Sequence, residues 1–389
     1  MTKHLLCLLI GGVVSLSAEM EWVIIGNDTK IECRETGLAK VAPRTDMVTF
    51  IDLNEGKEVL KGRYKVTHLP MKNSIFGPPT NLAVTPDQSM AIIANSVKWV
   101  EKDGAWNSEP ASQLHLVDLS SGKPTIIGSA TAGKQPSGLS ISRDGKMLLV
   151  ANRAEQSVSL YAISGKALQL LDKVQIGGQA AAIAFHPDGK SALVTKFSEH
   201  HVGQLVIKDE KLTYDPANDI PVGLWPYNIK ITPDGALAIV CNTGNNGLPD
   251  GNEDTLSLID LASERAHVCE TIPVGDGPEG LAISADGKYV AVPLLNGSAD
   301  MFKGKWFHNE HGAVVLYEVE GKTLRERSRV KTGAFPEGVS FSLDGTRLFV
   351  ANLDSETLTV FTHKEGVLEK FGEDYRLPGK PGSMGSALP

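Results

Sequence analysis

Several features that often reveal a protein's function are missing from this sequence. Its 389 residues contain only four cysteines, and no Cys-x-x-Cys motif suggests a haem or a cysteine-bound metal. There is no Rossmann glycine fingerprint, no P-loop and no nucleophile elbow. The sequence therefore offers no motif for a nucleotide, a dinucleotide or haem, and any hydrolysis would have to use an activated water molecule.

Positive charge and long apolar segments are also scarce. Lys and Arg number 38 against 46 Asp and Glu, so the formal net charge is -8. This balance argues against nucleic acid or an anionic membrane surface as a partner, because such contacts depend on basic side chains. No segment beyond the N-terminus is long and apolar enough to span a bilayer. Helical periodicity is nowhere sustained, which favours an all-β fold.

The first residues have the layout of a secretory signal. Lys3 precedes an apolar run over residues 5–14, and small residues up to Ala18 follow it. We therefore expect residues 1–18 to be a cleaved signal peptide. Residues 19–389 would then form one exported domain, periplasmic or secreted, with no membrane span.

A repeat fills this remaining part. Six segments align without gaps on an Asp-Gly turn, which is Asp-Gln in the first segment. An alternating strand, which begins with Pro-x-Gly in three segments, precedes the turn, and a second strand that usually ends in Asn follows it. The segments cover residues 79–95, 136–152, 180–196, 226–242, 278–294 and 336–352. Each is followed by two more strand patterns, and their spacing is close to that of propeller blades.

The two ends of the chain supply a seventh unit. Residues 22–27, 47–53 and 64–69 look like second, third and fourth strands that lack a first, and residues 380–387 look like the missing one. Sharing one blade between the termini would close the ring and leave no blade half-paired. We predict an all-β, seven-bladed β-propeller closed in this way.

The pattern P-x-G-[LIV]-x-[IF]-x-x-D-G followed by V-A-N resembles the YVTN-type propeller repeats. The wider group is that of the lactonase-like propellers, the 6-phosphogluconolactonase and carboxymuconate-cyclase relatives. The resemblance implies the fold for the whole mature chain. It does not select a function, since the group includes lactonases, cycloisomerases and non-catalytic binding proteins.

A ligand site is expected at the top face, where the Pro-x-Gly starts and the connections after the second strands meet. The middle residue of Pro-x-Gly is a glutamate in two neighbouring blades, Glu279 and Glu337. Such a pair could divide into a general acid and a general base, or could hold a cation. The alternative is a structural role, in which each glutamate accepts hydrogen bonds from backbone N–H groups or faces water. Tyr227 occupies the same position in the preceding blade.

Cationic residues follow the second strands of two other blades. Arg153 and Lys196, with His200 and His201 nearby, could form an arc that binds a carboxylate or phosphate. Ordinary solvated loop charge is the alternative. The asparagines that end five of the second strands are expected to be structural.

Four connections of the top face are long, namely residues 28–46, 96–112, 243–254 and 295–312, and we expect them to act as lids or partner surfaces. The last is richest in chemistry, because it contains Trp306, His308 and His311. These histidines could assist catalysis or, with His200 or His201, ligate a metal. We predict no cofactor, with a divalent metal as the alternative.

Two further hypotheses concern the top loops. An Asp-x-Asn-x-Asp run over residues 250–254 resembles the start of a calcium loop but lacks the glycine and the final glutamate. Cys33 and Cys241 both lie near this face, and a disulfide between them is a hypothesis, with Cys269 left over.

Two functions remain open. In the first, the protein binds or transforms a small anionic organic molecule by lactone hydrolysis or isomerisation, with Glu279, Glu337, His308 and His311 as catalytic candidates. Arg153, Lys196, His200, His201, Tyr227 and Trp306 would then bind the ligand. In the second, it is a non-catalytic scaffold subunit of a periplasmic redox complex, with the long loops docking a partner protein.

Overall fold

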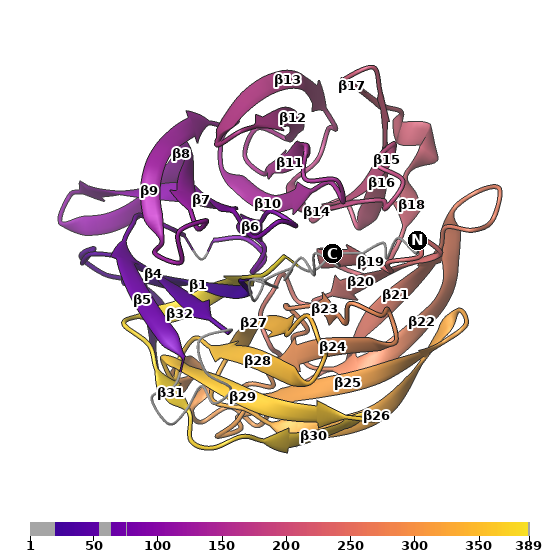
Figure 1. The fold of residues 1–389 in the computed structure, drawn as a ribbon. Helices are drawn as coiled ribbons and strands as arrows, with labels where there is room; N and C mark the ends of the chain where they lie inside the picture. Colours follow the sequence, from indigo (N-terminus) through magenta and orange to yellow (C-terminus); the bar gives the residue numbers. More distant parts are fainter. Residues whose placement is uncertain (1–19, 54–63, 75, 388–389) are drawn as a thin grey trace, which may run out of the picture.

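The structure, a computed structural model, describes residues 20–53, 64–74 and 76–387. Seven antiparallel blades surround a central channel, and the chain colours run round the ring from indigo to yellow (Figure 1). The predicted all-β, seven-bladed propeller is thereby confirmed. The proposed signal peptide lies outside the described residues. Among the residues that are described, no helix is long and apolar enough to cross a membrane.

Each blade is ordered from the channel outwards. Blade 1 contains β32 (Lys380–Gly385), β1 (Trp22–Asp28), β4 (Met47–Asp52) and β5 (Lys65–Pro70). Blade 2 contains β6 (Leu82–Val84), β7 (Met90–Lys102), β8 (Ala105–Asp118) and β9 (Thr125–Thr131). Blade 3 contains β10 (Pro136–Ile141), β11 (Met147–Asn152), β12 (Ser157–Ser164) and β13 (Ala167–Gln175). Blade 4 contains β14 (Ala180–Phe185), β15 (Ser191–Lys196), β16 (His201–Lys208) and β17 (Lys211–Tyr214), with β18 (Ile220–Pro221) also paired to β16.

The other three blades follow the same order. Blade 5 contains β19 (Pro226–Ile231), β20 (Leu237–Asn242), β21 (Asp254–Asp260) and β22 (His267–Gly275). Blade 6 contains β23 (Ala282–Ile283), β24 (Tyr289–Leu294), β25 (Ala313–Glu320) and β26 (Thr323–Lys331). Blade 7 contains β27 (Pro336–Phe341), β28 (Arg347–Asn352), β29 (Thr357–Lys364) and β30 (Val367–Lys370), with β31 (Tyr375–Arg376) also paired to β29. Outside the blades lie the hairpin β2 (Ile31–Arg34) and β3 (Gly37–Lys40), and the short 3₁₀ helices η2 (Pro216–Asn218) and η3 (Asp300–Phe302).

The ring is closed by the two ends of the chain, as predicted. The C-terminal strand β32 pairs antiparallel with β1, with Ile24 opposite Gly385 and Ile25 opposite Met384. Indigo and yellow strands accordingly lie side by side in blade 1 (Figure 1). The inner edge strand of each blade faces the channel and is backed by three more strands, so only the edges of the outer strands lie on the rim of the ring.

Apolar side chains fill the spaces between blades. One cluster joins Leu237 and Leu258 of blade 5 to Ile283, Val292 and Val315 of blade 6. The second strands are buried on both faces because blades pack on either side, which explains their continuous apolar runs. The alternation seen in the outer strands, such as β22, reflects one packed and one solvated face.

The glycine of Pro-x-Gly has a packing role. At the top of the channel the first strands of neighbouring blades approach closely. A Cβ on Gly280 would lie 2.1 Å from the backbone oxygen of Glu337, and one on Gly338 would lie 2.8 Å from the Cβ of Met384. At these two positions of the channel a side chain would collide with the neighbouring strand, so glycine is required there.

Two recurring polar motifs fix the ends of the strands. In the turns between first and second strands, an Asp accepts a hydrogen bond from the Ser or Thr two residues earlier, as Asp144 does from Ser142 at 2.7 Å. At the opposite end, the amide of Asn152 donates to the hydroxyls of Ser157 and Ser159. Asn27, Asn242 and Asn352 donate to hydroxyls in the same way, so these four asparagines have the structural role expected of them.

The long connection 96–112 was expected to be a loop, and this prediction is wrong. The strands β7 and β8 continue through it as a two-stranded ribbon, paired up to Lys102 and Ala105. The turn residues Asp103 and Gly104 both have positive φ, of 51° and 75°. An Asp-Gly pair in this conformation forms the tight hairpin turn whose twist matches that of the strands.

Candidate functional site

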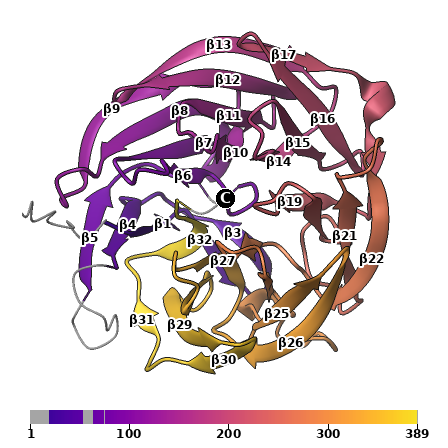
Figure 2. The same ribbon diagram turned by 45° about the vertical axis from the view of Figure 1, so that its right-hand side comes forward.

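A hairpin covers the top of the channel. The connection 28–46 of blade 1 forms β2 and β3, which pack against η3 in the long loop of blade 6. Ile31 and Cys33 of the hairpin share an apolar cluster with Leu295, Phe302 and Phe335. Figure 2 shows β3 near the inner strands β27 and β32. This connection is therefore a cover anchored on blades 6 and 7.

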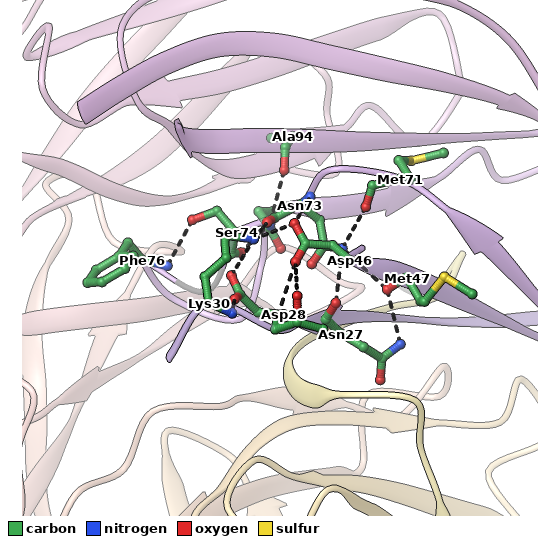
Figure 3. A network of polar contacts seen from close by, with 12 residues as sticks. Asn27, Asp28, Lys30, Asp46, Met47, Met71, Asn73, Ser74, Phe76 and Ala94 are labelled. Atoms are coloured by element: carbon green, nitrogen blue, oxygen red, sulfur yellow. Dashed lines mark hydrogen bonds and ion pairs between the residues drawn. The ribbon is translucent and has the colours of Figure 1, made fainter. Parts of the chain in front are cut away.

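A buried ionic network fixes the base of this hairpin (Figure 3). The Lys30 ammonium lies between Asp28, at 2.9 Å, and Asp46, and donates to the backbone oxygen of Asn73 at 2.7 Å. Asp46 also accepts from Thr29 through its backbone N–H and hydroxyl. Lys30 and Asp28 are 3% and 0% exposed. Burial raises the pKa of Asp28 to about 6, against the lowering effect of the Lys30 charge.

Glu279 and Glu337 lie beneath this cover at the starts of two adjacent inner strands. They are 6% and 5% exposed. Neither carboxyl accepts a hydrogen bond from the described residues, so backbone N–H groups of that part of the chain do not hold them. The predicted pair of carboxyl groups on neighbouring blades is therefore present, and it is buried with no hydrogen-bond donor from the part of the chain that the structure describes.

Burial and mutual repulsion govern the ionisation of this pair. Burial raises the pKa of Glu279 to about 8, although the positive charge of Arg153 opposes the shift. Burial raises the pKa of Glu337 well above its usual range, and the charges of Glu279 and Asp28 raise it further. The two groups therefore differ, with Glu279 the first to ionise and Glu337 the one that keeps its proton.

Arg153 connects this pair to an aromatic cluster. Its guanidinium lies over the ring of Phe197, 4.5 Å from the centroid, and 5.9 Å from the centroid of Tyr227. Its Nε donates to the Gln179 side chain at 3.4 Å. Phe197 and Tyr227 pack with their ring centroids 5.3 Å apart. The cluster holds a cation beside Glu279, as the sequence suggested for Arg153.

A cavity of about 400 Å³ opens beside Arg153. Its lining consists of Phe76, Gln135, Arg153, Ala154, Gln156 and Gln179. Its described lining includes no acidic residue, and three amide side chains offer both hydrogen-bond donors and acceptors. The cavity therefore suits a polar molecule that carries a negative charge.

Other predicted ligand-binding residues have different partners. The Lys196 ammonium is paired with Asp219 at 2.7 Å and contacts the Tyr214 hydroxyl at 3.0 Å. His200 accepts a hydrogen bond from the backbone N–H of Trp225 and packs edge-on against its ring. His201 contacts the backbone oxygen of Glu199. These three side chains support the loop of blade 4, and the cationic arc reduces to Arg153.

The histidines of the long loop 295–312 do not join the glutamates. His311 is exposed and His308 half-buried, whereas both glutamates are buried. Trp306 is 80% exposed. Within the described part of the chain, no group of three or more His, Cys, Asp or Glu side chains is placed to hold a metal ion.

The acidic run and the cysteines have structural surroundings. Asp254 accepts a hydrogen bond from the backbone N–H of Gly277, and the Asp250 backbone N–H donates to Asp276, so the acidic run ties its loop to the next blade.

Cys33 and Cys241 are both free and lie in different apolar clusters. The hypothesis of a disulfide between them is therefore wrong.

The sequence did not reveal every residue of this site. Phe197 follows Lys196 directly, but only the fold shows that its ring supports Arg153. Lys30 and Asp28 were treated as parts of a loop, although a charged Asp-x-Lys immediately after a buried strand could have indicated a buried pair. Gln179 gave no signal, because an isolated glutamine is common on surfaces.

Comparisons with known proteins agree with the fold. A family model described as "Lactonase, 7-bladed beta-propeller" matches residues 105–211. The chain has the lactonase-like propeller fold. The predicted resemblance to the lactonase-like propeller group is thus confirmed. No curated protein matches the sequence significantly.

Solved structures of this fold cover nearly the whole chain. A periplasmic gluconolactonase from Pseudomonas aeruginosa is 20% identical, with a TM-score of 0.67, covering 95% of this chain and 100% of its own. A putative 6-phosphogluconolactonase from Bacteroides fragilis is 18% identical, with a TM-score of 0.66 and coverages of 96% and 99%. A chain of the hydrazine synthase from Kuenenia stuttgartiensis is 18% identical, with a TM-score of 0.61 and coverages of 84% and 92%. At these identities the likeness concerns the fold.

Proposed function

We propose that this protein hydrolyses the lactone of a small anionic organic acid at the Glu279–Glu337 pair. The observation that carries the proposal is the pair itself, two buried carboxyl groups on adjacent blades that have no hydrogen-bond donor among the described residues and unequal proton affinities. Carboxyl groups in such surroundings are typical of acid and base partners. The lactonase names among the structural neighbours support the choice of substrate class.

The chemistry follows from the order of ionisation. Glu279, ionised first, takes a proton from a water molecule, whose oxygen attacks the lactone carbonyl. Glu337, still protonated, gives its proton to the ring oxygen as the carbon–oxygen bond of the tetrahedral intermediate breaks. The product is the hydroxy acid, and a proton passes back between the carboxyl groups through water. No step requires a nucleophilic side chain.

Arg153 would bind the anionic group of the substrate. Its guanidinium is half-buried, is backed by the Phe197 ring and faces the cavity of about 400 Å³. A carboxylate or phosphate held there would place the rest of the molecule near Glu279. The glutamine amides around the cavity favour a lactone that carries hydroxyl groups.

The test is lactone hydrolysis by matched variants. Proton release from δ-gluconolactone and its 6-phosphate would be followed by pH indicator, with the spontaneous rate subtracted. We expect Glu279→Gln and Glu337→Gln each to lower kcat by about a hundredfold or more. The exposed Glu310→Gln on the same face should be unaffected. Full turnover in the Glu279→Gln, Glu337→Gln double variant would contradict the assignment.

The second candidate is a scaffold subunit of an exported redox complex. Trp306, which is 80% exposed on the top face, is a suitable interface anchor, and one neighbour belongs to a hydrazine synthase. Native mass spectrometry of the protein from its own cells would decide. A second chain lost in Trp306→Ala would support the scaffold role, and a monomer that turns over lactones would exclude it.

Export to the periplasm or medium is part of both proposals. It rests on the signal-like layout of residues 1–18, with residues 19–389 as the mature propeller. Intact mass of the exported protein should show cleavage after Ser17 or Ala18. A full-length cytoplasmic chain would contradict it.

A further inference from the structure

The buried ionic network at the base of the covering hairpin contains one more carboxyl group than an ion pair needs. The ammonium of Lys30 lies between Asp28 and Asp46 (Figure 3). All three residues are at most 6% exposed. No step of the proposed lactone chemistry uses them. The fold therefore holds an amine against one carboxyl group, with a second carboxyl group beside it, largely out of contact with water.

The amine touches the group that it could attack. Lys30 Nζ contacts Oδ2 of Asp46, so the carboxyl carbon lies one bond beyond the contacted atom. Nζ also donates to the backbone oxygen of Asn73 at 2.7 Å, which orients the ammonium. Burial removes water from both ions, so transfer of one proton from Nζ to Oδ2 costs less here than at the surface. This transfer gives the neutral amine and the carboxylic acid that an amide condensation requires.

The other carboxyl oxygen of Asp46 has two hydrogen-bond donors. Oδ1 accepts from the backbone N–H of Thr29 at 3.1 Å and from the Thr29 hydroxyl at 3.0 Å. Two donors on one oxygen stabilise the negative charge that develops there when a nucleophile adds to the carboxyl carbon. In a condensation, Oδ1 would therefore remain as the amide oxygen, and Oδ2, beside the amine, would leave.

Asp28 is placed to move the protons of this reaction. Its Oδ2 lies 2.9 Å from Lys30 Nζ, and its Oδ1 accepts from the backbone N–H of Lys30 at 2.6 Å. Burial raises the pKa of Asp28 to about 6. A carboxyl group with such a pKa can accept and release a proton near neutral pH.

We propose that Lys30 and Asp46 become joined by an amide bond, an intramolecular modification that Asp28 promotes. A proton first passes from Nζ to Oδ2, and Nζ then forms a bond to Cγ of Asp46 while negative charge develops on Oδ1. Asp28 takes a proton from Nζ and gives it to Oδ2, the bond between Cγ and Oδ2 breaks, and one water molecule leaves. The amide keeps one of the three ammonium protons, the other two leave with the water, and Asp28 is again a carboxylate.

The bond would tie together the two ends of the cover. Both strands of the hairpin, β2 and β3, lie between Lys30 and Asp46 in the chain, so the amide closes a covalent loop around them. The modification does not depend on the proposed lactone chemistry. Until the bond forms, the site is the ion pair of Figure 3, and stability measurements on that pair refer to unlinked protein.

A second buried pair provides a control within the same chain. Lys196 Nζ lies 2.7 Å from Asp219, and their side chains are 8% and 9% exposed. Its other hydrogen-bond partner in the described part of the chain is the Tyr214 hydroxyl, which is not a carboxyl group. This pair has an amine and a carboxyl group but no second carboxyl group to move the protons, and we expect it to remain unlinked.

The experiment is tryptic peptide mapping of the whole protein, kept for days at neutral pH, with tandem mass spectrometry. Trypsin does not cleave after an amidated lysine, so the peptide containing Lys30 should continue past it and be joined to the peptide containing Asp46. The joined mass should be one water molecule below the sum of the two peptides. Cleavage after Lys196 should be normal.

Two variants test the roles of the neighbouring groups. Asp28→Asn keeps an oxygen acceptor for the Lys30 backbone N–H but cannot exchange protons, and it should lower the linked fraction at the same age about tenfold or more. Thr29→Val lacks the hydroxyl donor to Oδ1 and should also lower the linked fraction. Circular dichroism would confirm that each variant is folded.

The wild-type digest decides by itself, even where a variant does not fold. Complete cleavage after Lys30 in the aged wild type would overturn the proposal. An equal linked fraction in folded Asp28→Asn would also overturn it, and so would an equal linked fraction for Lys196 and Asp219, because contact alone would then be sufficient.

Discussion

Removing the Lys30 ammonium should expose how much the buried network of Figure 3 contributes to stability. Lys30→Met keeps the length and apolar stem of the side chain but leaves Asp28 and Asp46 without their cation. Both carboxyl groups are almost fully buried, at 0% and 6% exposure. Breaking a buried ion pair by removing one partner costs about 3–5 kcal/mol. We expect a loss of that size in the free energy of unfolding at about pH 8.

The destabilisation caused by Lys30→Met should increase as pH rises. The folded-state pKa of Asp28 is already raised, to about 6, so its contribution to stability is largest in acid and is lost as pH rises through that value. Without Lys30, whose charge lowers this pKa, the loss extends to higher pH. The variant should therefore be strongly destabilised at about pH 8 and much less so at about pH 5, where the carboxyl groups can be neutral.

Urea unfolding followed by tryptophan fluorescence would measure both effects. The matched control is Lys98→Met, which removes an exposed pair with Glu109, and it should change stability little at any pH. A Lys30→Met loss no larger than that of Lys98→Met would refute the reasoning. So would a large loss that is the same at both pH values.

Further outcomes follow from the buried groups. Activity towards lactones should rise as pH increases through about 8, because Glu279 must ionise to act as base, and a pH–rate profile with no rise there would contradict its role. Glu279→Gln should also raise the free energy of unfolding at about pH 8 by up to a few kcal/mol. The reason is that the raised pKa of Glu279 makes the stability of the wild type fall as pH rises. A variant that is equally or less stable in urea would count against a buried acid at this position. In alkylation of the native protein, the exposed Cys269 should react first while the buried Cys33 and Cys241 remain protected; rapid labelling of all three would contradict the fold. Gly280→Ala should lower the melting temperature, because its Cβ would lie 2.1 Å from a backbone oxygen; an unchanged melting temperature would show that the inner strands can separate.

The sequence could predict the fold because the repeat states each local rule many times. Alternating strands, Asp-Gly turns and Pro-x-Gly starts recur round the ring. An assignment that is ambiguous in one blade can therefore be made by comparison with the other blades. The glutamates were found for the same reason, since they occupy a repeat position that the fold brings to the channel. The prediction of a loop over residues 96–112 was wrong because the extension of β7 and β8 is found in this blade and is not part of the repeat pattern. Its structure depends only on the local residues of the hairpin.

The candidate site was harder to predict because loops, not blades, decide the partners of its charges. Lys196 occupies the repeat position next to that of Arg153, yet Asp219 from an irregular segment neutralises it. The hairpin that covers the channel is a property of the closed ring. It has no counterpart in the spacing of residues along the chain.

The pairing of β32 with β1 has a consequence for how the protein reaches its native state. Ile24 meets Gly385, so the final contact of the ring joins residues near the two extremes of the chain. Pairings between such distant residues form slowly, because a long loop must be closed first. A nascent chain still lacking its last strand has an open blade 1, with β1 offering an unpaired edge to any neighbouring chain. Ring closure should therefore be the last step of folding, and the interval before it should be the period when the protein is most exposed to aggregation and proteolysis.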